Sequence, residues 1–278
     1  MLAHEFIRNA LLAGSLIALA SGPIGYFVVL RSQVFAADAL SHVAFTGTLA
    51  AAAAGLDLRL GLFCATVLVA VALAALGGRA PADDATIGTV FVWVLGLGVL
   101  FLDLYSSGSA GGNGTLAART LFGSIFGLGA ADARVAALIA LALSAALLAI
   151  CRPLLFATLD PRAARARGVP VRLLGAIFLV LLGLDAGEAT QAVGALLLLG
   201  LLAAPAGAAH RLTANPYLAM ALSAGIALVS VWLGIALSYE ISALPPSSAI
   251  VAVATGCYGA ALGARRWSAR RSPIPSGV

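Results

Sequence analysis

The chain has 278 residues, of which 62% are hydrophobic and only 10% are charged, and its mean hydropathy is +1.07. This composition excludes an ordinary soluble globular domain and indicates a polytopic membrane protein. The formal net charge is +5, but the sixteen basic residues, all arginines, are spread over short connections rather than gathered in one basic domain. We therefore infer contact with membrane lipid and no nucleic-acid partner.

The hydropathy pattern predicts an all-α integral membrane helical bundle of eight or nine transmembrane helices. Each candidate segment has roughly the 20 mostly apolar residues that a spanning helix needs. The sixth and seventh segments adjoin one another, which is why the count is eight or nine. The segments are residues 7–30, 34–55, 58–77, 85–103, 132–155, 172–187, 189–209, 216–238 and 247–264.

The distribution of arginine predicts the orientation of the chain, because cytoplasmic connections of membrane proteins are enriched in basic residues. With nine spans and the N-terminus outside, twelve arginines fall on the cytoplasmic side, including those of a C-terminal tail at residues 265–278. Only Arg8, Arg59, Arg119 and Arg134 remain outside. We expect a multi-pass protein of the cell membrane with its C-terminus in the cytoplasm.

Asp38 and His42 are the first candidate binding residues, near the start of the second segment. Positions i and i+4 of a helix lie on one face, so a carboxylate and an imidazole can hold one ion between them. These donors suit Zn²⁺, Mn²⁺ or Fe²⁺ better than Ca²⁺. The alternative is structural: Asp38 caps the helix and His42 binds a carbonyl inside the bundle. Ionisable groups within a membrane are costly and usually line a path or a site, which favours the metal hypothesis.

A second polar cluster, Asp185, Glu188 and Gln191, lies where the sixth segment meets the seventh, near the predicted outer mouth. Spacings of three residues place the three side chains on one helical face. Two interpretations remain open, a solvated turn between two helices and an entry site for a metal ion.

Two prolines lie inside predicted spans, Pro23 between Gly22 and Gly25 and Pro205 between small residues. Because proline removes a helix hydrogen bond and clashes with the preceding turn, we expect both helices to be kinked. Such kinks serve gating in some membrane proteins and only packing in others.

Residues 160–168 predict a short cytoplasmic helix. Asp160 has the N-cap position, Pro161 the first helical position, and Gly168 ends the helix. Arg162, Arg165 and Arg167 lie between these signals, as in a topology-fixing loop or a docking element for a cytoplasmic partner.

The outer connection at residues 104–131 contains a glycine- and serine-rich run at 106–114, for which we expect a flexible tip, and then a re-entrant or interfacial turn at 121–127. The glycine cluster lacks the Gly-Lys-Ser/Thr ending of a phosphate-binding loop. The chain has no Walker A motif, so an energy source must come from another chain.

Several blocks of the sequence resemble the permease subunits of the bacterial zinc and manganese ABC importers of the ABC-3 type. The most specific is residues 35–42, Phe-Ala-Ala-Asp-Ala-Leu-Ser-His, which matches that family's Phe-Ala-Gly-Asp-Ala-x-Ser-His pattern with alanine in place of glycine at position 37. Phe45-Thr46-Gly47 stands where Leu-Pro-Gly is usual, and the loss of that proline is expected to straighten the helix past His42. The other matching blocks are residues 29–31, 121–125, 160–170, 191–206 and 244–251.

The resemblance implies a type II ABC importer-like permease forming a single transmembrane domain over residues 1–278, with residues 160–168 as the helix that couples it to an ATPase. It also implies a second permease copy, a cytoplasmic ABC ATPase that binds ATP, and an extracellular metal-binding lipoprotein. The transported ion is expected to be zinc or manganese. The permease itself is then a transport subunit and not an enzyme, without its own ATPase site or a permanently bound cofactor.

Three other functions are compatible with parts of the sequence. A permease for a metal chelate such as a siderophore, haem or corrinoid has the same architecture. An ATP-independent carrier or channel would transport an ion without a partner ATPase. A membrane scaffold without transport is disfavoured by the ionisable pair Asp38 and His42.

Overall fold

Eight helices of the structure are long and apolar enough to cross a membrane, which confirms the all-α membrane bundle. The structure is a computed structural model and describes residues 4–77, 83–108, 115–241 and 243–271. The eight are α1 (Glu5–Leu30), α2 (Val34–Ala54), α3 (Leu58–Leu76), α4 (Asp84–Gly108), α6 (Ala130–Leu159), α8 (Val171–Val193), α10 (Pro216–Glu240) and α11 (Pro246–Arg271).

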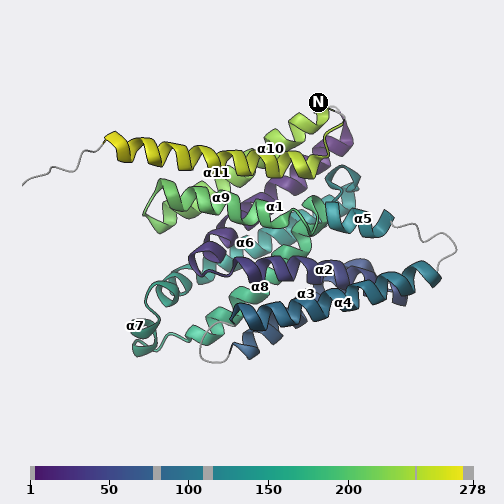
Figure 1. Ribbon diagram of the computed structural model, residues 1–278, viewed down its shortest axis with the longest axis horizontal. Coiled ribbons are helices and arrows are strands. Elements are labelled where there is room, and N and C mark those ends of the chain that lie inside the picture. The colour runs from purple at the N-terminus through teal and green to yellow at the C-terminus, as the bar shows by residue number, and fades with distance from the viewer. Residues whose placement is uncertain (1–3, 78–82, 109–114, 242, 272–278) are drawn as a thin grey trace, which may run out of the picture.

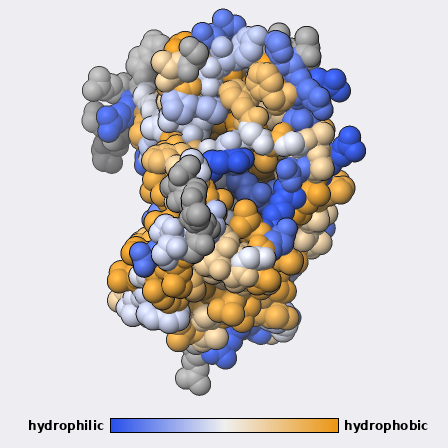
Figure 2. Space-filling model, turned by 90° about the vertical axis from the view of Figure 1, so that its right-hand side faces the viewer, coloured by the Kyte–Doolittle hydropathy of each residue, from blue (hydrophilic) through white to orange (hydrophobic). Residues whose placement is uncertain are grey.

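Four shorter elements complete the chain: α5 (Thr115–Phe122), the 3₁₀ turn η1 (Ile125–Gly127), α7 (Pro161–Ala166) and α9 (Leu198–Leu212). The long helices run roughly parallel to one direction, with α7 at one end of the bundle and α5 at the other (Figure 1). We call these the α7 end and the α5 end. Viewed onto the α5 end, hydrophilic residues gather in the middle and along the upper edge of the face, and hydrophobic residues cover much of the rest (Figure 2).

The helices form two groups joined by α8. On one side α1 packs against α10, α9 and α6, while α11 covers α10 and α9. On the other side α2 packs against both α3 and α4, and α8 contacts α3, α6 and α2 (Figure 1). Glycine lets α1 approach its neighbours closely: a Cβ atom on Gly22 would overlap the backbone of Ala224 in α10. Pro23 lies beside this contact, inside the continuous helix α1, and Pro205 lies inside α9.

The predicted boundary between the sixth and seventh spans is wrong. Helix α8 continues through the expected gap to Val193, and the chain turns at Gly194, whose φ of 93° favours glycine. A side chain at Gly194 would also overlap the backbone of Phe122 and Gly123. The break is therefore set by the close approach of the α5 segment, which the hydropathy pattern does not reveal.

Helix α9 begins inside the bundle rather than at its surface. The turn before it is paired with the end of α5, because Ala195 N donates to Thr120 O at 3.1 Å and Leu196 N donates to Leu121 O at 3.1 Å. From there α9 runs back to the α7 end, where His210 stacks on Tyr26 of α1 at 4.5 Å between ring centroids. Its 15 residues rise only about 22 Å, so α9 is too short to span a membrane alone.

Two predicted connections fall partly on residues that the structure leaves undescribed. The glycine-rich tip at 106–114 overlaps the end of α4, and its residues 109–114 lie outside the described part. The expected tail at 265–278 starts as helix, because α11 continues to Arg271, and residues 272–278 lie outside the described part.

Candidate functional site

Asp38 and His42 lie one turn apart on α2, and both side chains are half-buried. The His42 ring faces Phe91 of α4 at 5.2 Å between centroids. Within the described residues, no group of three or more His, Cys, Asp or Glu side chains lies together, so one copy of the chain supplies two donors at this position. Phe35, one turn before Asp38, also contacts Phe91 and flanks the pair on its apolar side.

Ser41 anchors the pair to the break between α8 and α9. Its buried hydroxyl lies 2.7 Å from Asp38 O and 3.1 Å from Ala195 O. Ala195 belongs to the turn between α8 and α9, and that turn is hydrogen-bonded to the end of α5. The part of α2 that carries Asp38 and His42 is therefore linked through this turn to α5. Ser41 is thus a packing and hydrogen-bonding residue at this site.

Two of the three residues that depart from the pattern of the resembled family, Phe45 and Thr46, lie on α2 just past His42. Thr46 Oγ1 donates to Val94 O of α4 at 3.1 Å, and Phe45 and Thr46 are both buried. Helix α2 continues without interruption from Val34 to Ala54 past this point. Thr46 thus fastens α2 to α4 one turn beyond His42.

The second predicted cluster is not a solvated turn. Asp185 and Glu188 lie in the last turns of α8 and are each only 2% exposed. Ser21 Oγ of α1 donates to Asp185 Oδ1 at 3.0 Å, and Gln191 Nε2 donates to Glu188 Oε2 at 3.4 Å. The other carboxyl oxygen of each residue is buried without a hydrogen-bond partner among the described residues.

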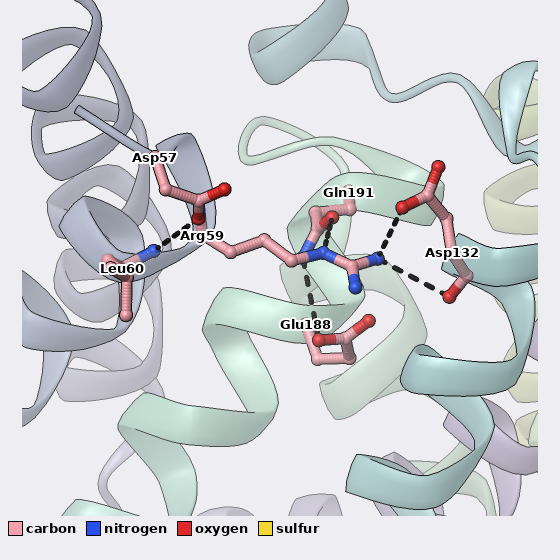
Figure 3. A network of polar contacts seen from close by, with 6 residues as sticks. All are labelled: Asp57, Arg59, Leu60, Asp132, Glu188 and Gln191. Atoms are coloured by element: carbon pink, nitrogen blue, oxygen red, sulfur yellow. Dashed lines mark hydrogen bonds and ion pairs between the residues drawn. The ribbon is translucent and has the colours of Figure 1, made fainter. Parts of the chain in front are cut away.

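Arg59, which sequence reasoning missed as a site residue, connects this cluster to two further helices (Figure 3). At the start of α3, its Nε donates to Gln191 Oε1 at 3.3 Å, and its Nη2 lies 3.4 Å from Asp132 Oδ1 at the start of α6. Asp57 caps α3 by accepting from the N–H groups of Arg59 and Leu60 at 2.9 and 3.1 Å. The only available signal was that Arg59 is one of four arginines predicted on the outer side.

The predicted helix at residues 160–168 is present as α7. Asp160 Oδ1 accepts from Arg162 N at 3.1 Å and from Ala163 N at 2.9 Å, and Pro161 occupies the first turn. Gly168 follows with a φ of 77°, in the left-handed region that ends the helix. Arg162, Arg165 and Arg167 are exposed, so α7 presents a basic surface at the end of the bundle.

Comparisons with known proteins find relatives along almost the whole chain. A family model described as the ABC 3 transport family matches residues 3–264. The manganese transport system membrane protein MntC of Halalkalibacterium halodurans is 28% identical over 264 residues, which cover 94% of this chain and 88% of that protein. The manganese import system permease protein ScaB of Streptococcus parasanguinis is 26% identical, over 86% of this chain and 83% of that protein.

The fold is also that of a solved structure, PsaBC from Streptococcus pneumoniae in complex with Fab. A chain of that structure superimposes with a TM-score of 0.83 at 24% sequence identity. The match covers 97% of this chain and 96% of the other.

Proposed function

This chain belongs to the ABC 3 transport family and is a multi-pass membrane permease, and on that premise we propose that it imports divalent manganese or zinc ions. The observation that supports this most is the pair Asp38 and His42, held half-exposed on α2. Ionisable groups within membrane helices are costly, and those that are present usually line a path or a site. The named manganese transport relatives make manganese the first ion to test.

We propose that two permease copies complete the metal site between them. One copy offers a carboxylate and an imidazole, a set too small to hold a divalent ion against water. A second copy related by two-fold symmetry would bring the same pair to the same axis, because an isologous interface repeats each residue on both sides. Four donors from two copies form a site through which an ion passes in transit.

The proposed partners bind at opposite ends of the bundle. A cytoplasmic ABC ATPase docks on α7, where Arg162, Arg165 and Arg167 are exposed, and an extracellular metal-binding lipoprotein delivers the ion at the α5 end. The asymmetry of arginine supports this orientation, since among the described arginines only Arg8, Arg59, Arg119 and Arg134 lie in the half of the bundle toward the α5 end (Figure 1). The protein then lies in a bacterial cell membrane, with its N-terminus outside the cell and its C-terminus in the cytoplasm.

Uptake by the reconstituted complex tests the proposed cargo and path. Proteoliposomes with permease, ATPase and binding protein receive free Mn²⁺, free Zn²⁺ or a metal chelate, and ATP-driven accumulation is measured. We expect uptake of a free ion, and its loss in His42→Ala. The matched control is His4→Ala, because His4 is exposed at the N-terminal end of α1. Unchanged uptake in His42→Ala, or uptake of the chelate alone, would contradict the proposal.

Docking on α7 is tested by reversing its charges. The variant Arg162→Glu, Arg165→Glu, Arg167→Glu is expected to lose both copurification with the ATPase and stimulation of ATP hydrolysis. Arg8→Glu with Arg134→Glu is the control, since both arginines are exposed at the α5 end. If the triple variant copurifies and stimulates hydrolysis normally, α7 is not the docking element.

A further inference from the structure

A cavity of about 810 Å³ lies at the α7 end of the bundle, away from Asp38 and His42. Its walls come from the turn between α1 and α2, the last turns of α3 and α6, helix α7 and the first turns of α8. The volume is within the usual range of small-molecule sites.

The charged side chains that line the cavity are all cationic among the described residues, and the polar residues Ser32, Gln33 and Thr158 are neutral. Arg31, Arg165 and Arg172 come from three different elements, and among the described residues no acidic side chain lines the cavity. Helix α8 begins here at Val171 without a side-chain cap, so the positive end of its dipole adds to the same field. The chemistry of this wall favours an anion.

Arg31 contacts neutral groups from three segments. Its Nε donates to Gln33 Oε1 at 3.1 Å, its Nη1 donates to Thr158 Oγ1 at 3.0 Å, and its guanidinium lies 5.4 Å from the centre of the Phe178 ring. All of these partners are neutral, and burial lowers the pKa of the Arg31 side chain. A partly buried charge is stabilised far better by an opposite charge than by neutral groups alone.

Part of the apolar lining faces outward. Val71 of α3 and Leu173 of α8 are 52% and 57% exposed, on helices long enough to cross a membrane. Ala74 and Ala176 continue this surface into the cavity. The cavity thus joins a basic pocket to a surface suited to hydrocarbon chains.

We propose that this cavity binds one anionic phospholipid, with its phosphate at Arg31, Arg165 and Arg172 and its acyl chains along Val71 and Leu173. A soluble anion would use the basic wall but would leave the apolar surface uncovered, and a zwitterionic lipid would bring a cationic group into the arginine cluster. Basic pockets between transmembrane helices at the cytoplasmic face are known to hold anionic headgroups.

The position of the lipid suggests its role. Its headgroup would bridge α7, through Pro161 and Arg165, to the turn that precedes α2, through Arg31 and Gln33. That turn lies at the base of the helix that holds Asp38. The role, though not the binding itself, rests on the proposed function: the lipid would help transmit movement of α7 to α2.

Native mass spectrometry of the full-length permease tests the binding directly and needs no transport assay. The protein is purified in detergent with equal amounts of phosphatidylglycerol and phosphatidylcholine of different mass. We expect one retained phosphatidylglycerol per chain and no retained phosphatidylcholine. The variant Arg165→Gln with Arg172→Gln should retain it roughly 30-fold less strongly, because each arginine near an anionic headgroup contributes about 1 kcal/mol.

Two further variants separate a specific site from general lipid attraction. Arg152→Gln removes an exposed arginine of α6 that does not line the cavity, and should retain phosphatidylglycerol normally. Ala75→Trp puts a bulky side chain on the cavity wall without changing any charge, and should lose the lipid. Equal retention of both lipids, equal loss in Arg152→Gln, or displacement of the lipid by excess inorganic phosphate alone would overturn the proposal.

Discussion

Two pairs of polar side chains lie one helical turn apart in membrane helices of this protein, and they differ in what surrounds them. Asp38 and His42 on α2 are half-exposed. Asp185 and Glu188 on α8 are 2% exposed, and each is hydrogen-bonded to another polar side chain. The two pairs therefore differ in burial and in bonding. We expect the less buried pair to meet the cargo and the fully buried pair to tie helices together.

The buried pair belongs to a network that connects four helices. Asp185 accepts a hydrogen bond from Ser21 of α1. Gln191 links Glu188 to Arg59 of α3, which binds Asp132 of α6 (Figure 3). Breaking such a network should change the stability of the protein more than its transport activity. Changing Asp38 or His42 should change transport activity more than stability.

The largest effect is expected at the half-buried pair, Asp38 and His42. Asp38→Asn keeps the shape of the side chain but removes the charge that neutralises a divalent ion. We expect uptake to fall by roughly 100-fold, since even residues that only orient metal ligands cost 10- to 100-fold. Thermal unfolding followed by gel filtration should be unchanged. A fall in stability as large as that expected below for Gly194→Ala or Ser21→Ala would contradict the distinction between the two pairs.

Gly194→Ala should be the most destabilising single change near the buried pair. Its left-handed φ and the overlap of a new Cβ with the α5 segment should together lower the free energy of unfolding by about 3 kcal/mol. Gly256→Ala is the control, because a Cβ on Gly256 of α11 would meet no atom within 4 Å. Equal stability of the two variants would show that the break before α9 is not fixed by this contact.

Ser21→Ala tests the bond between α1 and α8 without touching a carboxylate. It leaves both oxygens of Asp185 without a side-chain donor, and we expect a loss of about 1–3 kcal/mol in the free energy of unfolding. Uptake per folded protein should persist. Ser144→Ala is the control, since Ser144 bonds only to Ala140 O of its own helix. Abolished uptake with normal stability would instead place Asp185 on the transport path.

Thr46→Val is expected to have the smallest effect. It removes the hydrogen bond to Val94 O while keeping the side-chain shape, at a cost of about 1 kcal/mol in the free energy of unfolding. Thr89→Val, which loses only a bond within α4, serves as the comparison. A large loss of uptake in Thr46→Val would show that the anchoring of α2 to α4 sets the geometry at His42.

The sequence predicted the features that depend on local composition. Of the nine apolar segments predicted, eight correspond to the eight membrane helices, and Asp160, Pro161 and Gly168 placed α7, because hydropathy, caps and stops act over a few residues. The spacing of Asp38 and His42 likewise put both side chains on one face of α2.

The features that were missed depend on contacts between distant segments. Arg59 meets Asp132 and Gln191 only in the folded bundle, and no periodicity links these positions. The break at Gly194 depends on the backbone of Phe122 and Gly123. Without that contact, residues 189–209 look like one continuous apolar helix, which is why the length of α8 was predicted wrongly.

The central claim is that Asp38 and His42 bind the transported ion, and electron spin echo spectroscopy of bound Mn²⁺ tests it most directly. The assembled permease and ATPase, loaded with Mn²⁺ and freed of excess metal, should show nitrogen hyperfine coupling from an imidazole ligand. That coupling should vanish in His42→Ala and persist in His4→Ala. Bound Mn²⁺ without nitrogen coupling, or coupling that survives in His42→Ala, would contradict the account.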